Sequence, residues 1–235
     1  MDYKDYERGH KGTNFWFKGK CELIGILLNK TNKKGMKILD IGAGTGEDLA
    51  VLNNFGSCYV LDINLEALEQ VPENLCIDKK CGDANNLPYE SEFFDLVVAF
   101  DVFEHIDNDY KALDEIKRVL KPDGLLVFTV PAFQFLYGPH DKALDHKRRY
   151  SRKTLSQLLS TLNCIYLNYW NFFMFLPIAT FRLIRKNATP NVDPFTFNKS
   201  IDNMLYFLLQ IENKLVKKSF KLPFGLSLIG ICKKL

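Results

Sequence analysis

Several features that would assign the chain to a broad class are missing from its sequence. Its six cysteines are scattered over 235 residues without a C-x-x-C pair. We therefore expect no disulfide framework and no zinc site, and reduced thiols favour a cytoplasmic location. A formal net charge of +3 is too small to predict nucleic-acid binding. The charged N-terminus lacks an apolar h-region, so no secretory signal is expected.

What the sequence does contain predicts one main α/β domain. Hydrophobic residues make up 47% of the chain, which is enough for a large core. From about residue 36 to residue 130, strand-like apolar runs alternate with helical segments, the pattern of a parallel sheet with helices on both faces. Residues 107–120 predict an amphipathic helix, Ser151 is a candidate cap for another, and strands are expected at 164–170 and 226–232.

A glycine-rich turn after the first apolar strand is the most informative local feature. The strand 38–41 contains Asp40, and the turn consists of Gly42, Ala43, Gly44, Thr45 and Gly46. Glycine accepts positive φ and has no Cβ, so the backbone can turn sharply and approach a ligand before a helix expected at about residue 47. That residue is glutamate, where a dinucleotide-binding fingerprint would need glycine. A plain connection between strand and helix is the alternative.

Further motifs follow the glycines in a fixed order. A second strand ends at Asp62, whose carboxylate oxygens are suited to accept hydrogen bonds from both hydroxyls of a ribose. A third strand, predicted over residues 76–80, leads into a Gly-Asp-Ala turn at 82–84. The buried strand 93–100 is followed by the segment 101–106, and the sequence L-K-P-D-G at 120–124 predicts a turn before a strand at 125–130.

This series of motifs resembles that of class I S-adenosylmethionine (SAM) dependent methyltransferases. The resemblance implies a Rossmann-like, seven-stranded, mostly parallel sheet with helices on both faces, an antiparallel last strand and a helical insertion near the C-terminus. It implies SAM as cofactor and S-adenosylhomocysteine as product, with ribose at Asp62, adenine at Asp83 and Ala84, and the methionine end at Asp101. The implied cofactor-binding residues are Asp40, Gly42, Ala43, Gly44, Gly46, Asp62, Ile63, Asp83, Ala84 and Asp101.

The candidate acceptor site lies in loops expected at the carboxyl ends of the strands, where three of the four histidines fall. Transfer of a methyl group to a hydroxyl requires removal of a proton, and we predict His140, oriented by Asp141, as the general base, with His105 as the alternative. These histidines could instead cap helices or bind backbone carbonyls. No set of metal ligands stands out, so no metal is expected, although a divalent ion at Asp141 stays open.

A basic cluster beside aromatic residues suggests what the acceptor carries. Arginine binds phosphate or carboxylate through two parallel hydrogen bonds, so an anionic small molecule, sugar or lipid-linked acceptor would suit the cluster, whereas a solvated charge run is the alternative. The run 137–150 also resembles a bacterial subgroup of these enzymes linked to surface-polysaccharide and glycolipid pathways. The predicted substrate-binding residues are Tyr137, His146, Arg148, Arg149, Tyr150, Trp16 and His10.

The remaining segments complete the predicted organisation. We expect an N-terminal helical lid or cap over 1–35, a SAM-binding core over 36–172, an apolar helical insertion over 173–222 and the final strand over 223–235. The uncharged stretch 172–181 is too short to span a bilayer. This stretch has three possible roles: peripheral membrane contact, dimerisation, or packing on the apolar stripe at 201–216. The chain is thus expected to be a monomer or a homodimer.

Together these features predict a methyltransferase acting on a hydroxyl of a small-molecule, sugar or glycolipid acceptor, with N-methylation of a small molecule as the alternative. An oxidoreductase is disfavoured because the chain has no Y-x-x-x-K pair. A non-catalytic SAM-binding module is disfavoured by the histidines and arginines of the acceptor region. Enzymes that methylate a flipped base commonly carry N-P-P-Y or P-C motifs, and neither is present, so no nucleic-acid partner is expected.

Overall fold

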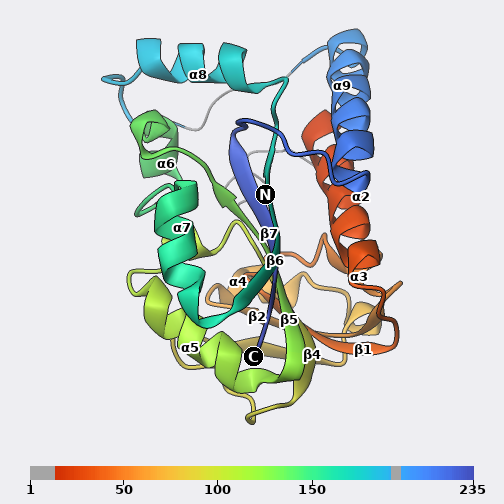
Figure 1. Cartoon of the computed structure of the whole chain (residues 1–235). Coiled ribbons are helices and arrows are strands. Elements are labelled where there is room, and N and C mark those ends of the chain that lie inside the picture. Colours follow the sequence, from red (N-terminus) through yellow and green to blue (C-terminus); the bar gives the residue numbers. More distant parts are fainter. Residues whose placement is uncertain (1–13, 192–196) are drawn as a thin grey trace.

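A seven-stranded sheet forms the centre of the computed structural model, which describes residues 14–191 and 197–235 (Figure 1). Its strand order is β3-β2-β1-β4-β5-β7-β6. Neighbouring strands from β3 to β5 are parallel, whereas β7 runs antiparallel to both β5 and β6. The strands are β1 (Met36–Ile41), β2 (Gly56–Asp62), β3 (Asp78–Cys81), β4 (Phe94–Phe100), β5 (Leu120–Pro131), β6 (Asn163–Trp170) and β7 (Ser227–Lys233). The predicted fold class and the antiparallel last strand are confirmed.

Helices cover both sides of this sheet (Figure 1). α2 and α9 lie side by side on one side, and α5, α6 and α7 lie on the other. The α-helices are α2 (Phe15–Lys30), α3 (Leu49–Leu52), α4 (Leu65–Glu69), α5 (Asp109–Val119), α6 (Pro139–Ala143), α7 (Arg152–Leu158), α8 (Phe175–Ile184) and α9 (Lys199–Lys217). Short 3-10 helices are η1 (Glu73–Leu75), η2 (Phe103–His105), η3 (Gln134–Leu136) and η4 (Leu159–Thr161).

The apolar pattern of the sequence explains this layering. β4 and β5 are buried along almost their whole length, as expected for central strands with helices on both faces. α5 begins where the Asn108 side chain accepts a hydrogen bond from the Lys111 N–H, and α7 begins where Ser151 accepts one from the Thr154 N–H. Because β1 pairs in parallel with both β2 and β4, the carboxyl ends of these three strands meet at one end of the sheet, where the glycine turn lies.

The structure differs from the sequence predictions at several boundaries. The helix after the glycines begins at Leu49 rather than near residue 47, and β3 covers Asp78–Cys81 rather than 76–80. Residues 120–124 belong to β5, which begins at Leu120 and accommodates Asp123 with φ of +61° beside an irregularity in the pairing with β4. Each difference is a local extension or shift of an element that the sequence placed correctly in order.

The helix α9 packs on α2, and its Glu212 also accepts hydrogen bonds from the Phe172 N–H at the start of the apolar stretch 172–181. A Cβ atom at Gly19 would lie 2.5 Å from Leu209 Cδ1, so the missing side chain lets the two helices approach closely. The Asn213 side chain donates a hydrogen bond to the Gly19 carbonyl at 3.0 Å. α8 instead lies beside η3. Within the described residues, no helix has the length and apolar character needed to cross a membrane.

Candidate active site

All three glycines of the turn adopt the left-handed conformation that the sequence predicted, with φ of +71° at Gly42, +55° at Gly44 and +79° at Gly46. A Cβ atom at Gly42 would lie 2.6 Å from Val102 Cγ2, and one at Gly46 would lie 2.9 Å from Leu49 Cδ1. No heavy atom lies within 4 Å of the corresponding position at Gly44. The turn is thus tightly packed at both ends and open in the middle, which leaves space for a ligand at Gly44.

Asp62 lies directly beside this opening. Its Oδ2 atom accepts a hydrogen bond from the Gly44 N–H at 2.8 Å, and its Oδ1 atom accepts one from the Asn64 N–H at 2.8 Å. The next side chain, Ile63, is 76% exposed. The end of β2 therefore presents a fixed carboxylate and an apolar surface next to the glycine turn, the combination that a nucleoside requires.

Asp40 lies beneath the turn rather than on its surface. Only 2% of the residue is exposed, and Oδ2 has no hydrogen-bond partner among the described residues. Burial, followed by the nearby negative charge of Asp48, raises the pKa of this carboxyl well above its ordinary value. Ala43 is partly buried against the core. Both residues shape the turn from below, and Asp40 keeps an unpaired oxygen beside it.

The Gly-Asp-Ala turn adjoins the end of β2. The Gly82 N–H donates to the Asp62 carbonyl at 3.0 Å, which brings this turn next to Asp62. Asp83 is exposed, and its Oδ1 atom accepts hydrogen bonds from the Asn85 backbone and side chain at 2.8 and 3.0 Å. Ala84 is buried. The predicted adenine-contacting turn therefore adjoins Asp62, and its contact with adenine stays a prediction.

The Asp101 carboxylate, after β4, pairs with a lysine that the sequence analysis missed. Its Oδ1 atom accepts a hydrogen bond from Thr129 Oγ1 at 2.8 Å, and Oδ2 lies 3.3 Å from Lys20 Nζ. Lys20 is only 3% exposed and also lies 3.8 Å from Asp48. Burial alone would raise the pKa of Asp101 and lower that of Lys20, but the charge of Lys20 lowers the pKa of Asp101, and the charges of Asp48 and Asp101 raise the pKa of Lys20.

A signal for Lys20 was present in the sequence. The lysine lies on the face of α2 that otherwise carries buried Leu23, Ile24 and Leu27. A charged residue at a core position of an amphipathic helix is usually paired. Its partner Asp101 lies far away in the sequence, so only the fold reveals the pair.

A second group of polar residues lies just after Asp101. Glu104 is completely buried, and neither carboxylate oxygen has a hydrogen-bond partner among the described residues. Burial, then the charge of Asp101, raises the pKa of Glu104 well above its ordinary value. The rings of His105 and His146 meet edge to face with centroids 4.6 Å apart.

Within the described residues, Glu104, His105 and His146 are the one group whose ligand atoms could hold a metal ion, all lying within 4.8 Å of one another. We call these three residues the histidine–glutamate cluster. No set of metal ligands stood out in the sequence, because His146 joins the cluster from a distant loop.

Asp141 contacts His146, whereas we expected it to orient His140. Its Oδ1 atom lies 3.1 Å from His146 Nδ1 and 2.7 Å from Arg149 Nε. Its Oδ2 atom accepts a hydrogen bond from the Gly138 N–H at 2.9 Å. Asp141 is completely buried, so these contacts fix the His146 ring.

The predicted basic cluster is divided among internal contacts. Arg149 is only 5% exposed and pairs with Asp141, and Arg148 pairs with Asp109 at 2.9 Å. The Tyr150 hydroxyl donates to Asp109 Oδ2 at 2.8 Å. These polar groups hold the loop to the core, and binding of an anionic substrate by this basic cluster stays a prediction.

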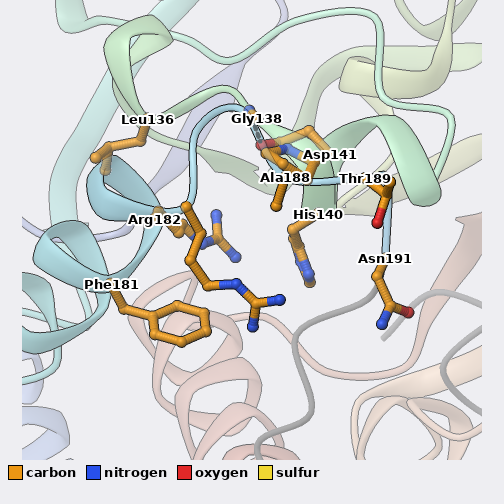
Figure 2. Close-up of a pocket in the computed structure, with 11 residues that line it drawn as sticks. Leu136, Gly138, His140, Asp141, Phe181, Arg182, Ala188, Thr189 and Asn191 are labelled. Atoms are coloured by element: carbon orange, nitrogen blue, oxygen red, sulfur yellow. Dashed lines mark hydrogen bonds between the residues drawn. The ribbon is translucent and has the colours of Figure 1, made fainter.

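His140 lines a separate pocket between α6 and α8 (Figure 2). Figure 2 shows the side chains of His140 and Arg182 extending into the same space. Burial, then the positive charge of Arg182, lowers the pKa of His140 to about 3. The pocket is lined by Leu136, Gly138, Pro139, His140, Asp141, Phe181, Arg182, Arg185, Ala188, Thr189 and Asn191. Because Asp141 both lines the pocket and contacts His146, the pocket adjoins the histidine–glutamate cluster.

Among the other predicted substrate-binding residues, Tyr137 and Trp16 make contacts within the protein. The Tyr137 hydroxyl donates to the His146 carbonyl at 2.8 Å, so it supports the loop that carries the cluster. Trp16 packs against Trp170 with ring centroids 5.3 Å apart, which agrees with the alternative of a helix anchored by tryptophan. His10 and the first 13 residues of the proposed lid over 1–35 lie outside the described residues, and the lid role stays a prediction.

The fold and the site together define the class of protein. A Rossmann-like sheet with an antiparallel β7, a glycine turn after β1 and carboxylates after β2 and β4 are the features of a class I SAM-dependent methyltransferase domain. Residues 39–128 match the methyltransferase domain family. The match spans the cofactor side of the site and ends before the loop that carries Asp141 and His146.

Known proteins resemble about half of the chain in sequence. An uncharacterized protein of Methanocaldococcus jannaschii is 40% identical over 110 residues, covering 46% of this chain and 47% of that protein. The ubiquinone/menaquinone biosynthesis C-methyltransferase of Neisseria meningitidis is 37% identical over 124 residues, covering 48% and 49%. The chain thus spans about half the length of these curated relatives.

A solved structure from Thermotoga maritima, described as a SAM-dependent methyltransferase and possible histamine N-methyltransferase, matches with a TM-score of 0.63. The match covers 99% of this chain and 95% of that one at 17% identity, so it shows the shared fold. The residues present fit SAM. Gly44 leaves open space, Asp62 and Ile63 border it, and Asp101 with Lys20 supplies charges of both signs.

Proposed function

We propose that the chain is a SAM-dependent methyltransferase that methylates a hydroxyl of a small-molecule, sugar or glycolipid acceptor. The proposal that the chain binds SAM rests on the open space at Gly44. The Gly44 N–H beside this space donates a hydrogen bond to the Asp62 carboxylate. This opening lies within the segment that matches the methyltransferase domain family. When bound, SAM supplies an activated methyl group on a sulfonium, so the protein mainly has to align donor and acceptor.

Each side of the opening suits one part of the cofactor. Asp62 has acceptor oxygens for ribose hydroxyls, and exposed Ile63 offers an apolar surface to adenine. At the other end, Asp101 suits an ammonium group and Lys20 suits a carboxylate. The methionine part of SAM carries both charges, so this pair would hold it by complementary attraction.

Oxygen as the acceptor atom is supported by the groups near Asp101. A hydroxyl must lose a proton during methylation, and imidazoles are the usual side chains for that task. His140 is neutral at neutral pH, but a pKa of about 3 makes it a weak base. His105 is therefore the stronger candidate for the proton acceptor, although the role of either histidine stays a prediction. The sugar or glycolipid nature of the acceptor and a peripheral membrane contact likewise stay predictions.

Calorimetric titration tests the cofactor assignment. S-adenosylhomocysteine should bind with micromolar affinity, whereas NADH, run under the same conditions, should not bind. Asp62→Ala should weaken S-adenosylhomocysteine binding at least about tenfold, because a charge-assisted hydrogen-bond acceptor is lost. Asp114→Ala, on the exposed face of α5, is the matched control and should bind like the wild type. NADH binding without S-adenosylhomocysteine binding would overturn the assignment.

The acceptor is tested separately with SAM labelled in its methyl group. Polar sugars, lipid-linked glycans and amines of similar size should be offered in parallel, and the labelled position determined by NMR. We expect the label on oxygen. Label found on nitrogen in every product would replace hydroxyl methylation with the N-methylation alternative.

A further inference from the structure

We propose that the histidine–glutamate cluster is a binding site for a divalent transition-metal ion. Glu104, His105 and His146 offer one carboxylate and two imidazoles whose ligand atoms lie within 4.8 Å of one another. This ligand set suits Zn²⁺, Fe²⁺, Co²⁺ or Mn²⁺, whereas Mg²⁺ and Ca²⁺ prefer sites made of oxygen. Three protein ligands also leave coordination positions open for a further molecule.

The burial of Glu104 is the first independent observation. The residue has no exposed surface, and both carboxylate oxygens lack hydrogen-bond partners among the described residues. Burying a carboxyl group without any partner costs free energy, and native proteins rarely leave such a group unsatisfied. A cation bound between Glu104 and the histidines would provide the missing partner for both oxygens.

The contacts around His146 are the second observation. Asp141 holds Nδ1 of His146 at 3.1 Å and is itself held by Arg149 and the Gly138 N–H. A carboxylate bonded to one ring nitrogen fixes the tautomer and makes the other nitrogen a better metal ligand. Asp141, which the sequence suggested as an ion ligand or an aid to His140, therefore acts as a positioning residue for His146.

The backbone also fixes the two segments that carry the ligands. The Lys147 N–H donates to the Glu104 carbonyl at 2.7 Å, and the Tyr150 hydroxyl donates to the Phe103 carbonyl at 3.1 Å. These contacts join η2 to the loop before α7 on both sides of the cluster. The site is therefore preorganised, as a metal site requires.

The position of the cluster suggests what the ion would do. Glu104 follows Asp101 by three residues, so the ion would lie next to the predicted methionine end of SAM. Resting on the proposed function, we infer that it would bind oxygens of the acceptor and lower the pKa of the reacting hydroxyl, which would replace the proton-acceptor role of His105 because that imidazole would bind the ion. The acceptor class that fits carries a second oxygen donor beside that hydroxyl, as in a vicinal diol or a hydroxy acid.

Cobalt titration tests the site without relying on activity. Tag-free protein is treated with a chelator and dialysed, and Co²⁺ is added while its visible absorption is recorded. We expect saturable binding of one Co²⁺ ion per chain without thiolate charge-transfer absorption. Zn²⁺ should displace the bound Co²⁺, whereas Mg²⁺ at the same concentration should not. His146→Ala and Glu104→Gln should each weaken binding at least about tenfold.

A matched histidine variant and a folding check make the test decisive. His140→Ala removes a neighbouring imidazole outside the cluster and should bind Co²⁺ like the wild type. Thermal unfolding should show that Glu104→Gln is folded, since it replaces an unpartnered carboxyl with a neutral group of the same shape. Equal affinity of wild type, His146→Ala and Glu104→Gln would overturn the site, as would thiolate absorption or Mg²⁺ binding as tight as that of Co²⁺.

S-adenosylhomocysteine titrated into the same samples separates the two proposals. Cofactor binding without cobalt binding would remove the metal site and leave the methyltransferase proposal standing. Cobalt binding without cofactor binding would do the opposite. If both are present, added metal should raise transfer to vicinal diols and hydroxy acids more than transfer to isolated hydroxyls, and equal stimulation would remove the inferred acceptor class.

Discussion

The two sides of the site are built in different ways. On the cofactor side, the functional residues other than Lys20 lie at or just after strand ends, and their main contacts join neighbouring strand ends, as between Gly44 and Asp62. On the acceptor side, polar contacts join residues from distant elements, such as Glu104 with the loop at Lys147. The first side depends on backbone conformation, and the second depends on buried polar pairs. Substitutions should therefore have different consequences on the two sides.

The largest effect is expected at the buried ion pair of the acceptor side. Arg149→Met should lower the free energy of unfolding by about 3–5 kcal/mol, because Asp141 would lose its shortest charged contact in a buried setting. Denaturant unfolding measures the change. Lys153→Ala, an exposed basic residue on α7, is the control and should shift stability by less than about 0.5 kcal/mol. A small effect of Arg149→Met combined with lost acceptor turnover would support the predicted substrate-binding role.

The next effect depends on pH and concerns Glu212, which accepts hydrogen bonds from the Phe172 N–H at the start of the 172–191 segment. Burial raises its pKa from 4.5 to about 7, against the opposing effect of these backbone contacts. A folded-state pKa above the unfolded value stabilises the protein fully at pH below about 4.5, and this stabilisation is lost as pH rises to about 7.

Glu212→Gln removes this titration. Between pH 4.5 and pH 8, the stability of the wild type relative to the variant should therefore fall by about 2–3 kcal/mol. Denaturant unfolding at several pH values measures the difference, and Glu66→Gln, which changes an exposed residue of α4, is the control. A difference that stays constant with pH would show that Glu212 is ionised throughout, and that the start of the 172–191 segment is held by a charge.

The same contrast explains what the sequence could predict. Alternating apolar runs, glycines and strand-end carboxylates are local signals, so the order of the strands and the surroundings of Gly44 followed from them. The pairing of Lys20 with Asp101 and the grouping of His146 with Glu104 carry no such local signal, because the partners lie in different parts of the chain. The burial of Arg149 was not predicted, because a basic residue next to other basic residues looks exposed in sequence, whereas the fold buries it against Asp141.

Lys20 sharpens the comparison, because it reaches the cofactor side from a distant helix. Lys20→Met should weaken S-adenosylhomocysteine binding by about 10–100-fold, the loss of a charged hydrogen bond. Binding of methylthioadenosine, which lacks the amino-acid part, should stay unchanged. Calorimetry measures both ligands, and Lys18→Met on the exposed face of α2 is the control. Equal weakening of the two ligands would indicate that Lys20 supports the fold and does not contact the methionine end.

We expect the smallest effects on stability from substitutions at two glycines of similar conformation. Comparing them also separates backbone strain from contact with the ligand. Gly35 has φ of +64° and Gly44 has φ of +55°, and a Cβ atom at either would meet no heavy atom within 4 Å. Gly35→Ala and Gly44→Ala should therefore each lower the free energy of unfolding by about 1–2 kcal/mol, the cost of left-handed backbone with a side chain.

Only Gly44→Ala should also weaken S-adenosylhomocysteine binding, because its new methyl group would occupy the space left for the cofactor. Denaturant unfolding and calorimetry on the two variants measure stability and affinity separately. If both variants bind like the wild type, the open space at Gly44 is not where the cofactor approaches the turn. If only Gly44→Ala loses affinity at equal stability, the glycine is required by the ligand as well as by the backbone.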